Sequence, residues 1–253
     1  MDGVLQRDTM MQMRKRRSVW VLVLVLGFLI PIGAEGQEKE TIRRFALVAG
    51  SNDGGPKRPT LRYAHNDAKA IARVLQQLGG VKRRDSVVLI EPDRFDFEAG
   101  LARLRDRLER SKAAGLRLEV LFYYSGHSDE QGLMLGDDKI TYKELRRSIA
   151  ALPADVRIAV LDSCSSGVLT RTKGGTRQPP FLMDTSVDVK GYAYLTSSSA
   201  DESAQESDKV GGSFFTHYFV SGLRGAADTS KDNKITLNEA YQYAFDETLA
   251  RTE

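Results

Sequence analysis

The sequence predicts an α/β fold, with a mostly parallel sheet covered by helices on both faces. Short, continuous apolar runs alternate with longer segments whose apolar residues recur at helical spacing. Strands that are apolar at nearly every residue are typical of parallel sheets, because both of their faces are buried. The chain has 253 residues, of which 41% are hydrophobic and 28% charged, and this is enough for one sizeable core.

The first half of the chain contains three predicted strands separated by two predicted helices. The strands are the apolar runs at 45–49, 87–90 and 118–124. The apolar positions of the two helices are Ala68, Ile71, Ala72, Leu75 and Leu78 in the first, and Phe97, Leu101, Leu104 and Leu108 in the second. This alternation predicts consecutive βαβ units.

The second half begins with a predicted hairpin and then continues the alternation. Residues 132–140 contain the turn signal Gly136-Asp137-Asp138, and Thr141 with Glu144 forms a capping-box pattern for a helix that runs to Leu152. Residues 165–190 are rich in Gly, Pro, Ser and Thr and predict a long mobile loop. The remaining elements are expected at 156–161 and 192–196 as strands, and at 214–223 and 237–249 as helices.

The first 36 residues have the pattern of a targeting segment. A basic stretch at 14–17 precedes an uncharged apolar run at 19–30, and the small residues Ala34 and Gly36 follow. This predicts a signal peptide cleaved near Gln37, with export to the periplasm or the extracellular space. The alternative is an N-terminal membrane anchor that is not cleaved; the run is short for a span, which favours export.

Charge and cysteine content exclude some classes of function. The whole chain has 37 Lys and Arg against 34 Asp and Glu, and no basic patch is interleaved with aromatic residues, so a nucleic-acid partner is not expected. The single cysteine, Cys164, rules out an intramolecular disulfide framework. Membrane contact is expected only if the N-terminal segment stays uncleaved.

Cys164 and His127 each follow a predicted strand. Cys164 comes after the run at 156–161, among small, turn-forming residues, and His127 comes after the run at 118–124. If the two strands are parallel neighbours, both side chains lie at the same carboxyl edge of the sheet, where ligands bind in open α/β folds. The sequence therefore predicts a Cys/His dyad.

Such a dyad has a defined chemistry. Only the thiolate attacks well, so His127 accepts the proton of Cys164 and later gives it to a leaving amine. The backbone N–H groups of Gly126 and Cys164 are candidates for an oxyanion hole. The alternative is an inert small cysteine beside a hydrogen-bonded loop histidine.

Two segments resemble a known family. The segments Tyr123-Tyr124-Ser125-Gly126-His127 and Leu161-Asp162-Ser163-Cys164-Ser165-Ser166-Gly167 are similar to the catalytic histidine and cysteine segments of the caspase and metacaspase superfamily, and most of all to bacterial caspase-like proteins and metacaspases. The resemblance covers residues 43–250, apart from a serine at 165 where many relatives have histidine. It implies a caspase-like three-layer sandwich, a cysteine endopeptidase with protein or peptide substrates, and no required cofactor.

The resemblance also implies a substrate pocket. Asp67 and Asp162 match the acidic first pocket of metacaspase-like proteins, and Ser125 is placed to line it. Two carboxylates in one cleft would select Arg or Lys. The alternative roles are stabilisation of a helix N-terminus by Asp67 and of a strand end by Asp162. Relatives can be cut in the segment that matches 165–190, so self-cleavage there is a further hypothesis.

Residues 228–239 resemble an EF-hand calcium loop. The candidate ligands are Asp228, Ser230, Asp232, Lys234, Thr236 and Glu239. Asn233 stands where the loop usually has glycine, and asparagine tolerates the left-handed conformation needed there. The alternative is an Asx-rich turn before a helix, without metal.

The sequence thus favours an exported cysteine endopeptidase that cleaves after Arg or Lys. A non-catalytic caspase-like binding or scaffold domain, with or without a response to calcium, is the alternative from another class. An aspartate-specific peptidase is the third reading.

Overall fold

The computed structural model describes residues 42–163, 181–182, 191–197 and 206–252. The predicted targeting segment at 1–36, Cys164 and most of the predicted loop at 165–190 lie outside the described residues. Export, anchoring and self-cleavage therefore stay predictions. No helix in the described part of the chain is both long and apolar enough to cross a bilayer.

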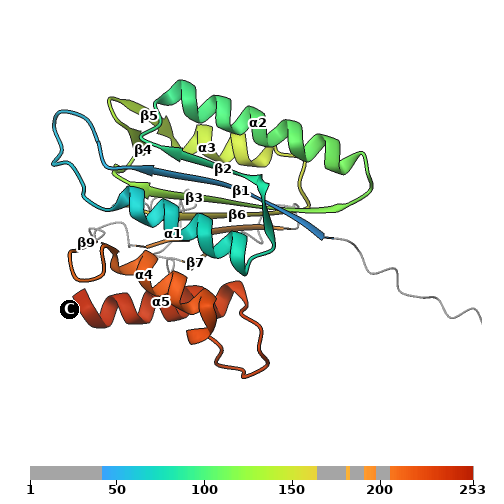
Figure 1. The fold of residues 1–253 in the computed structure, drawn as a ribbon. Coiled ribbons are helices and arrows are strands. Elements are labelled where there is room, and N and C mark those ends of the chain that lie inside the picture. Colours follow the sequence, from blue (N-terminus) through green and yellow to red (C-terminus); the bar gives the residue numbers. More distant parts are fainter. Residues whose placement is uncertain (1–41, 164–180, 183–190, 198–205, 253) are drawn as a thin grey trace, which may run out of the picture. The chain divides into compact units, whose positions relative to one another are not determined.

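The main sheet confirms the predicted α/β fold (Figure 1). Its described strands lie in the order β2-β1-β3-β6-β8-β7. All pair in parallel except β7, which is antiparallel to β8. Their bounds are β1 Ile42–Ser51, β2 Val81–Ile90, β3 Arg117–Gly126, β6 Val156–Asp162, β7 Phe181–Leu182 and β8 Tyr192–Thr196.

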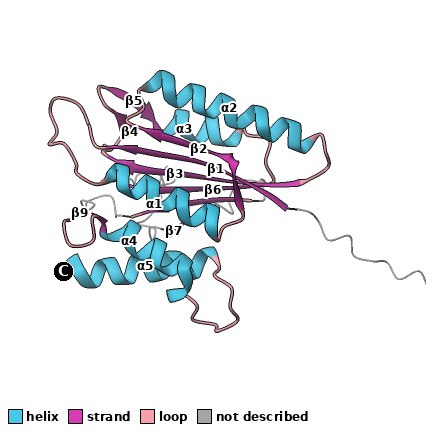
Figure 2. Ribbon diagram, in the orientation of Figure 1, coloured by secondary structure: helices cyan, strands magenta, loops and turns pink. Residues whose placement is uncertain are grey.

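Helices cover both faces of this sheet, as predicted (Figure 2). On one face, α2 (Arg94–Lys112) and α3 (Tyr142–Ala150) pack with Phe45 and Leu47 of β1 in one apolar cluster. The other face is covered by α1 (Ala64–Gln77), α4 (Phe214–Ser221) and α5 (Leu237–Thr252), which pack with Ala46 and Val48. Alternate residues of β1 thus face opposite layers, which explains why residues 45–49 are all apolar.

The predicted hairpin and capping box are both present. Strands β4 (Gly132–Leu135) and β5 (Asp138–Thr141) pair antiparallel, and Gly136 in their turn has φ 58°. A positive φ of this kind favours glycine. The Thr141 side chain accepts a hydrogen bond from Glu144 N, and the Glu144 side chain accepts one from Thr141 N, which starts α3.

Several local features differ from the predictions or were not predicted. Leu78 lies past the end of α1 and is 61% exposed, because the helix stops before the predicted apolar stripe does. The predicted loop at 165–190 contains strand β7, which completes one edge of the sheet. A short hairpin of β9 (Glu206–Ser207) and β10 (Gly212–Ser213) precedes α4, and α4 continues into a π-helical turn at Gly222–Ala226. Elements of two residues are too short to show a hydrophobic period.

The capping box of α3 gives a test of the fold. Thr141→Ala removes the hydroxyl that accepts from Glu144 N, so the free energy of unfolding is expected to fall by about 1 kcal/mol. Urea unfolding measures it. Thr141→Ser keeps the hydroxyl and is the matched control. Equal stability of the two variants would contradict the assigned role of this cap.

Candidate active site

The carboxyl ends of β1, β3 and β6 meet at one edge of the sheet. Ser125 of β3 lies in register with Gly50 of β1 on one side and with Asp162 of β6 on the other. His127 follows Ser125 by two residues, and Cys164 follows Asp162 by the same interval. The predicted parallel pairing of the two strands is therefore confirmed. Cys164 itself lies outside the described residues, directly after Ser163.

The His127 ring is held by the loop between β1 and α1. Its Nε2 atom lies 2.8 Å from the carbonyl oxygen of Pro59. A carbonyl only accepts hydrogen bonds, so Nε2 carries the proton and, in the neutral ring, Nδ1 keeps a lone pair that can accept one. Gly54 packs against the ring so closely that a Cβ atom there would overlap it. The Tyr124 hydroxyl lies 2.7 Å from the carbonyl oxygen of His127 and fixes the backbone at this point.

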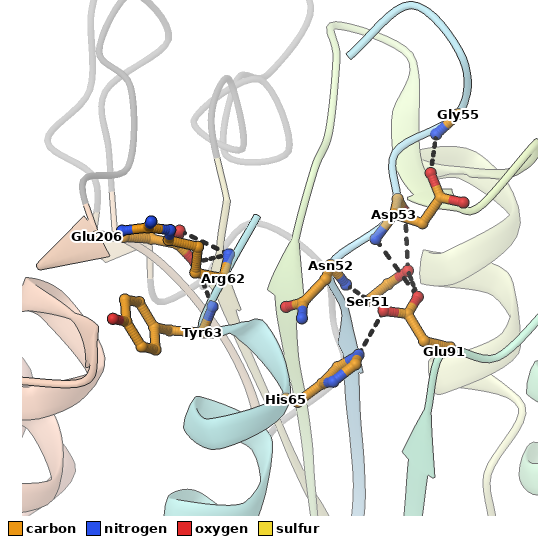
Figure 3. Close-up of polar contacts among 9 residues, drawn as sticks. All are labelled: Ser51, Asn52, Asp53, Gly55, Arg62, Tyr63, His65, Glu91 and Glu206. Carbon is orange, nitrogen blue, oxygen red and sulfur yellow. Dashed lines mark hydrogen bonds and ion pairs between the residues drawn. The ribbon is translucent and has the colours of Figure 1, made fainter. Parts of the chain in front are cut away.

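Glu91, just after β2, ties down the start of this loop. Its carboxylate accepts hydrogen bonds from Ser51 Oγ (2.9 Å) and Asn52 N (2.8 Å), and it also pairs with His65 Nε2. Figure 3 shows the Glu91 carboxylate between the His65 ring and the backbone at the end of β1. The middle of the loop is held by Arg58, which donates to Asp129. The residues that orient His127 are thus fixed from both sides.

Asp67 and Asp162 lie buried beside this histidine, as the acidic-pocket prediction requires. Asp67 accepts hydrogen bonds from Ser125 Oγ (3.1 Å) and Ser213 N (3.2 Å). Asp162 accepts from Thr216 Oγ1 (2.5 Å) and from Ser213 Oγ through one oxygen. Its other oxygen, Oδ1, is buried and has no close hydrogen-bond partner among the described residues, although the Ser197 hydroxyl lies near enough to lower the pKa of Asp162. An unmatched carboxylate oxygen of this kind favours a cation or a donor.

The two carboxyl groups influence each other's ionisation. Burial raises the pKa of Asp67 from its ordinary value of 3.8 to about 8, and the nearby charge of Asp162 adds to the shift. Burial raises the pKa of Asp162 as well. Asp67 therefore holds a proton at neutral pH when no cation is present.

A narrow cavity joins these groups. Its lining brings together the predicted residues Asp67, Ser125, Gly126, His127 and Asp162, to which the structure adds Leu61, Glu206 and Ser213. The cavity holds about 20 Å³, which is room for about one water molecule. An Arg or Lys side chain requires it to widen.

A comparison with protein families identifies the family of this chain. The family model described as Caspase domain matches residues 43–244 of the chain. The chain belongs to the caspase family. No curated protein matches the chain. Membership in this family of cysteine peptidases makes proteins or peptides the substrate class of the caspase domain, and it confirms the resemblance and the fold predicted from the sequence.

Among the residues of the caspase domain's pocket that were not predicted, Glu206 also holds the start of α1. Glu206 of β9 lines the cavity, and its carboxylate accepts hydrogen bonds from the backbone N–H groups of Arg62 (2.9 Å) and Tyr63 (2.8 Å). These groups precede α1, whose N-cap residue, Tyr63, makes no side-chain capping bond. The absence of Ser, Thr, Asp or Asn at this helix start is the signal that a distant acceptor was needed.

Gly126 has a structural reason to be glycine. A Cβ atom at this position would lie 2.8 Å from the carbonyl oxygen of Ser51 and would also overlap the Tyr124 hydroxyl. Packing beneath the site therefore requires this glycine. Its predicted oxyanion role, together with that of Cys164, stays a prediction.

The calcium loop keeps its carboxylates engaged with its own backbone. Asp228 accepts hydrogen bonds from Asp232 N (3.2 Å) and Asn233 N (3.0 Å), and Glu239 accepts from Thr236 N (2.9 Å). Asn233 has φ 61°, which confirms the expected left-handed conformation. Among the described residues, no group of three or more His, Cys, Asp and Glu is arranged to hold a metal. Calcium binding stays a prediction.

The anchoring role of Glu91 predicts a change in stability. Glu91→Gln weakens the acceptor of the Asn52 amide and the pairing with His65, so the free energy of unfolding is expected to fall by about 1 kcal/mol. Urea unfolding measures it. Glu98→Gln is the matched control, because Glu98 is exposed and pairs with Arg94 on the surface of α2, where a loss below about 0.5 kcal/mol is expected. Equal losses would contradict the role of Glu91.

The raised pKa of Asp67 predicts a pH dependence of stability. The unfolded chain ionises this group near pH 4, whereas the folded chain keeps it neutral up to about pH 8. The free energy of unfolding is therefore expected to fall as the pH rises between these values. Asp67→Asn should flatten this slope when urea unfolding is measured from pH 4 to 9. Asp137→Asn, at an exposed carboxylate in the β4–β5 turn, is the control, and an unchanged slope in Asp67→Asn would contradict the assignment.

Proposed function

We propose that the caspase domain is an active cysteine endopeptidase that cleaves peptides after Arg or Lys. The observation that carries this proposal is the buried carboxylate pair, Asp67 and Asp162, in a cavity whose wall is also formed by His127. A cation entering this cavity offsets the negative charge of the buried Asp162 carboxyl group, which lines it. A substrate held in this way has the bond after its basic residue next to the imidazole.

The chemistry follows from the protonation state of His127. Nδ1 accepts the proton of the Cys164 thiol, and the thiolate attacks the carbonyl carbon of the scissile bond. The imidazolium keeps its Nε2–H bond to the Pro59 carbonyl oxygen, which stabilises the positive charge. His127 then gives its Nδ1 proton to the leaving amine, and the acyl group stays on Cys164 as a thioester. Water hydrolyses the thioester, with His127 taking one proton and returning it to the sulfur.

The oxyanion that forms during each attack needs hydrogen-bond donors. The backbone N–H groups of Gly126 and Cys164 are the proposed donors, at the ends of β3 and β6 respectively. The register of β3 with β6 supports a common location for these two backbones.

Binding of a basic side chain is coupled to ionisation of the pocket. The pKa of Asp67 is about 8 while the pocket is empty, because burial and the charge of Asp162 disfavour a second anion. A guanidinium or ammonium group reverses this balance, so Asp67 loses its proton when the substrate binds. Glu206, which also lines the cavity, adds a third carboxylate.

The size of the cavity favours a second candidate function. At about 20 Å³ the pocket does not admit a basic side chain as it stands. A caspase-like domain whose pocket never widens would act as a non-catalytic binding or scaffold domain. The two functions differ in one requirement, which is turnover of a peptide.

Fluorogenic peptides that end in Arg, Lys or Asp separate these functions. We expect hydrolysis of the Arg and Lys peptides by the full chain, measured with and without calcium. Cys164→Ala and His127→Ala should lower kcat/KM by at least about 10²-fold, because each removes one member of the dyad. Asp162→Asn should raise KM for the Arg peptide by about tenfold or more, because it weakens a buried charge pair.

The control for the pocket is Asp137→Asn, which changes an exposed carboxylate in the β4–β5 turn. It should hydrolyse the Arg peptide like the unmodified chain. Absence of turnover on all three peptides would support the scaffold function, whereas turnover of the Asp peptide alone would contradict the acidic pocket.

A further inference from the structure

A second, larger cavity lies toward the amino ends of the parallel strands, whereas His127 lies at their carboxyl ends. It is formed by the beginning of β1, the first half of β2 and the carboxyl-terminal part of α2. Its volume is about 530 Å³, within the range of pockets that bind small molecules. The lining residues are Arg43, Arg84, Asp85, Arg107, Arg110 and Ser111, and we call this site the arginine cavity.

The one carboxylate of the arginine cavity is already paired. Asp85 is only 1% exposed, and both of its oxygens accept from the Arg43 guanidinium, at 3.0 Å from Nε and 2.7 Å from Nη2. This two-point ion pair raises the pKa of Arg43 and fixes the orientation of its side chain. Asp85 and Arg43 therefore neutralise each other and form a rigid wall of the cavity.

The other arginines of the cavity have little negative charge to balance them. Within the described residues, Arg84 forms no ion pair, and Arg107 contacts only the carbonyl oxygen of Ser86, at 3.4 Å. Arg110 lies 3.6 Å from Asp106, an exposed residue of the same helix, and this pair is weak. Three guanidinium groups thus line one cavity with one weak counter-charge, so the cavity has an excess of positive charge that an anion would offset.

The chemistry of guanidinium groups indicates which anion this is. A planar guanidinium group can donate two parallel hydrogen bonds to the oxygens of one phosphate group. A phosphate group offers several strong acceptors and up to two negative charges. We propose that the arginine cavity binds a phosphate-bearing ligand, either a soluble phosphate compound or the headgroup of an anionic phospholipid. The site is independent of the proposed peptidase activity, because its residues lie in the first halves of β1 and β2 and near the carboxyl end of α2, whereas His127 lies beyond the carboxyl end of β3.

Two binding measurements on the full chain test this proposal. Inorganic pyrophosphate is titrated into the protein by isothermal calorimetry. Vesicles of phosphatidylcholine, with or without phosphatidylglycerol, are sedimented with the protein. The test variant is Arg84→Gln with Arg107→Gln, which leaves the Arg43–Asp85 pair intact. The matched control is Arg83→Gln with Arg103→Gln, which removes the same charge from exposed positions of the same two elements outside the cavity lining.

We expect the test variant to lose at least about tenfold in affinity for one of the probes, and the control to change by less than about threefold. Binding of pyrophosphate without vesicle binding assigns a soluble ligand. Sedimentation that requires phosphatidylglycerol and depends on Arg84 and Arg107 assigns a lipid headgroup. Absence of binding to either probe, or equal losses in the test and control variants, overturns the proposal. Thermal unfolding of both variants shows whether a loss of binding reflects a loss of fold.

Discussion

The buried pair of Asp67 and Asp162 is the constraint on which the rest of the site depends. Two carboxylates removed from water need hydrogen-bond donors. Ser213 supplies a backbone N–H to Asp67 and a hydroxyl to Asp162, and the same hydroxyl caps α4 by accepting from Thr216 N. Gly212 lets this backbone approach, since a Cβ atom there would lie 2.5 Å from Asp67. The acidic pair thereby fixes α1, β6 and the start of α4 relative to one another.

The histidine side of the site follows a different principle, because backbone atoms hold it. Pro59 orients the ring through its carbonyl oxygen, and Gly54 supports the ring by direct packing. Both belong to the loop after β1, which depends on Glu91 for its position. The acidic side of the site is thus positioned by hydrogen bonds to two buried carboxyl groups. The histidine side is positioned by the backbone of a loop that Glu91 holds in place.

Much of the fold could be predicted because the chain signals it locally. Residues that are adjacent in the sequence predict the continuous apolar strands, the Thr141–Glu144 capping box and the Gly136 turn. His127 and Asp162 could be placed at one edge because parallel strands end together. Glu206 could not be predicted, because its contacts with the Arg62 and Tyr63 amides span more than a hundred residues of sequence and depend on a two-residue strand. The arginine cavity was missed for a similar reason, since its residues come from three separate elements.

The strand order has a consequence for how the molecule opens. Strands β3 and β6 are interior to the sheet, with β1 and β8 as their outer neighbours. Their ladders are flanked on both sides, so deuterium reaches their amides only when a neighbouring strand separates. Fraying that begins at β7 therefore leaves β3 and β6 paired, whereas fraying at β2 also releases Glu91 and the loop that it holds. The backbone amides of β3 and β6, the strands that lead into His127 and Cys164, are therefore expected to exchange with deuterium last.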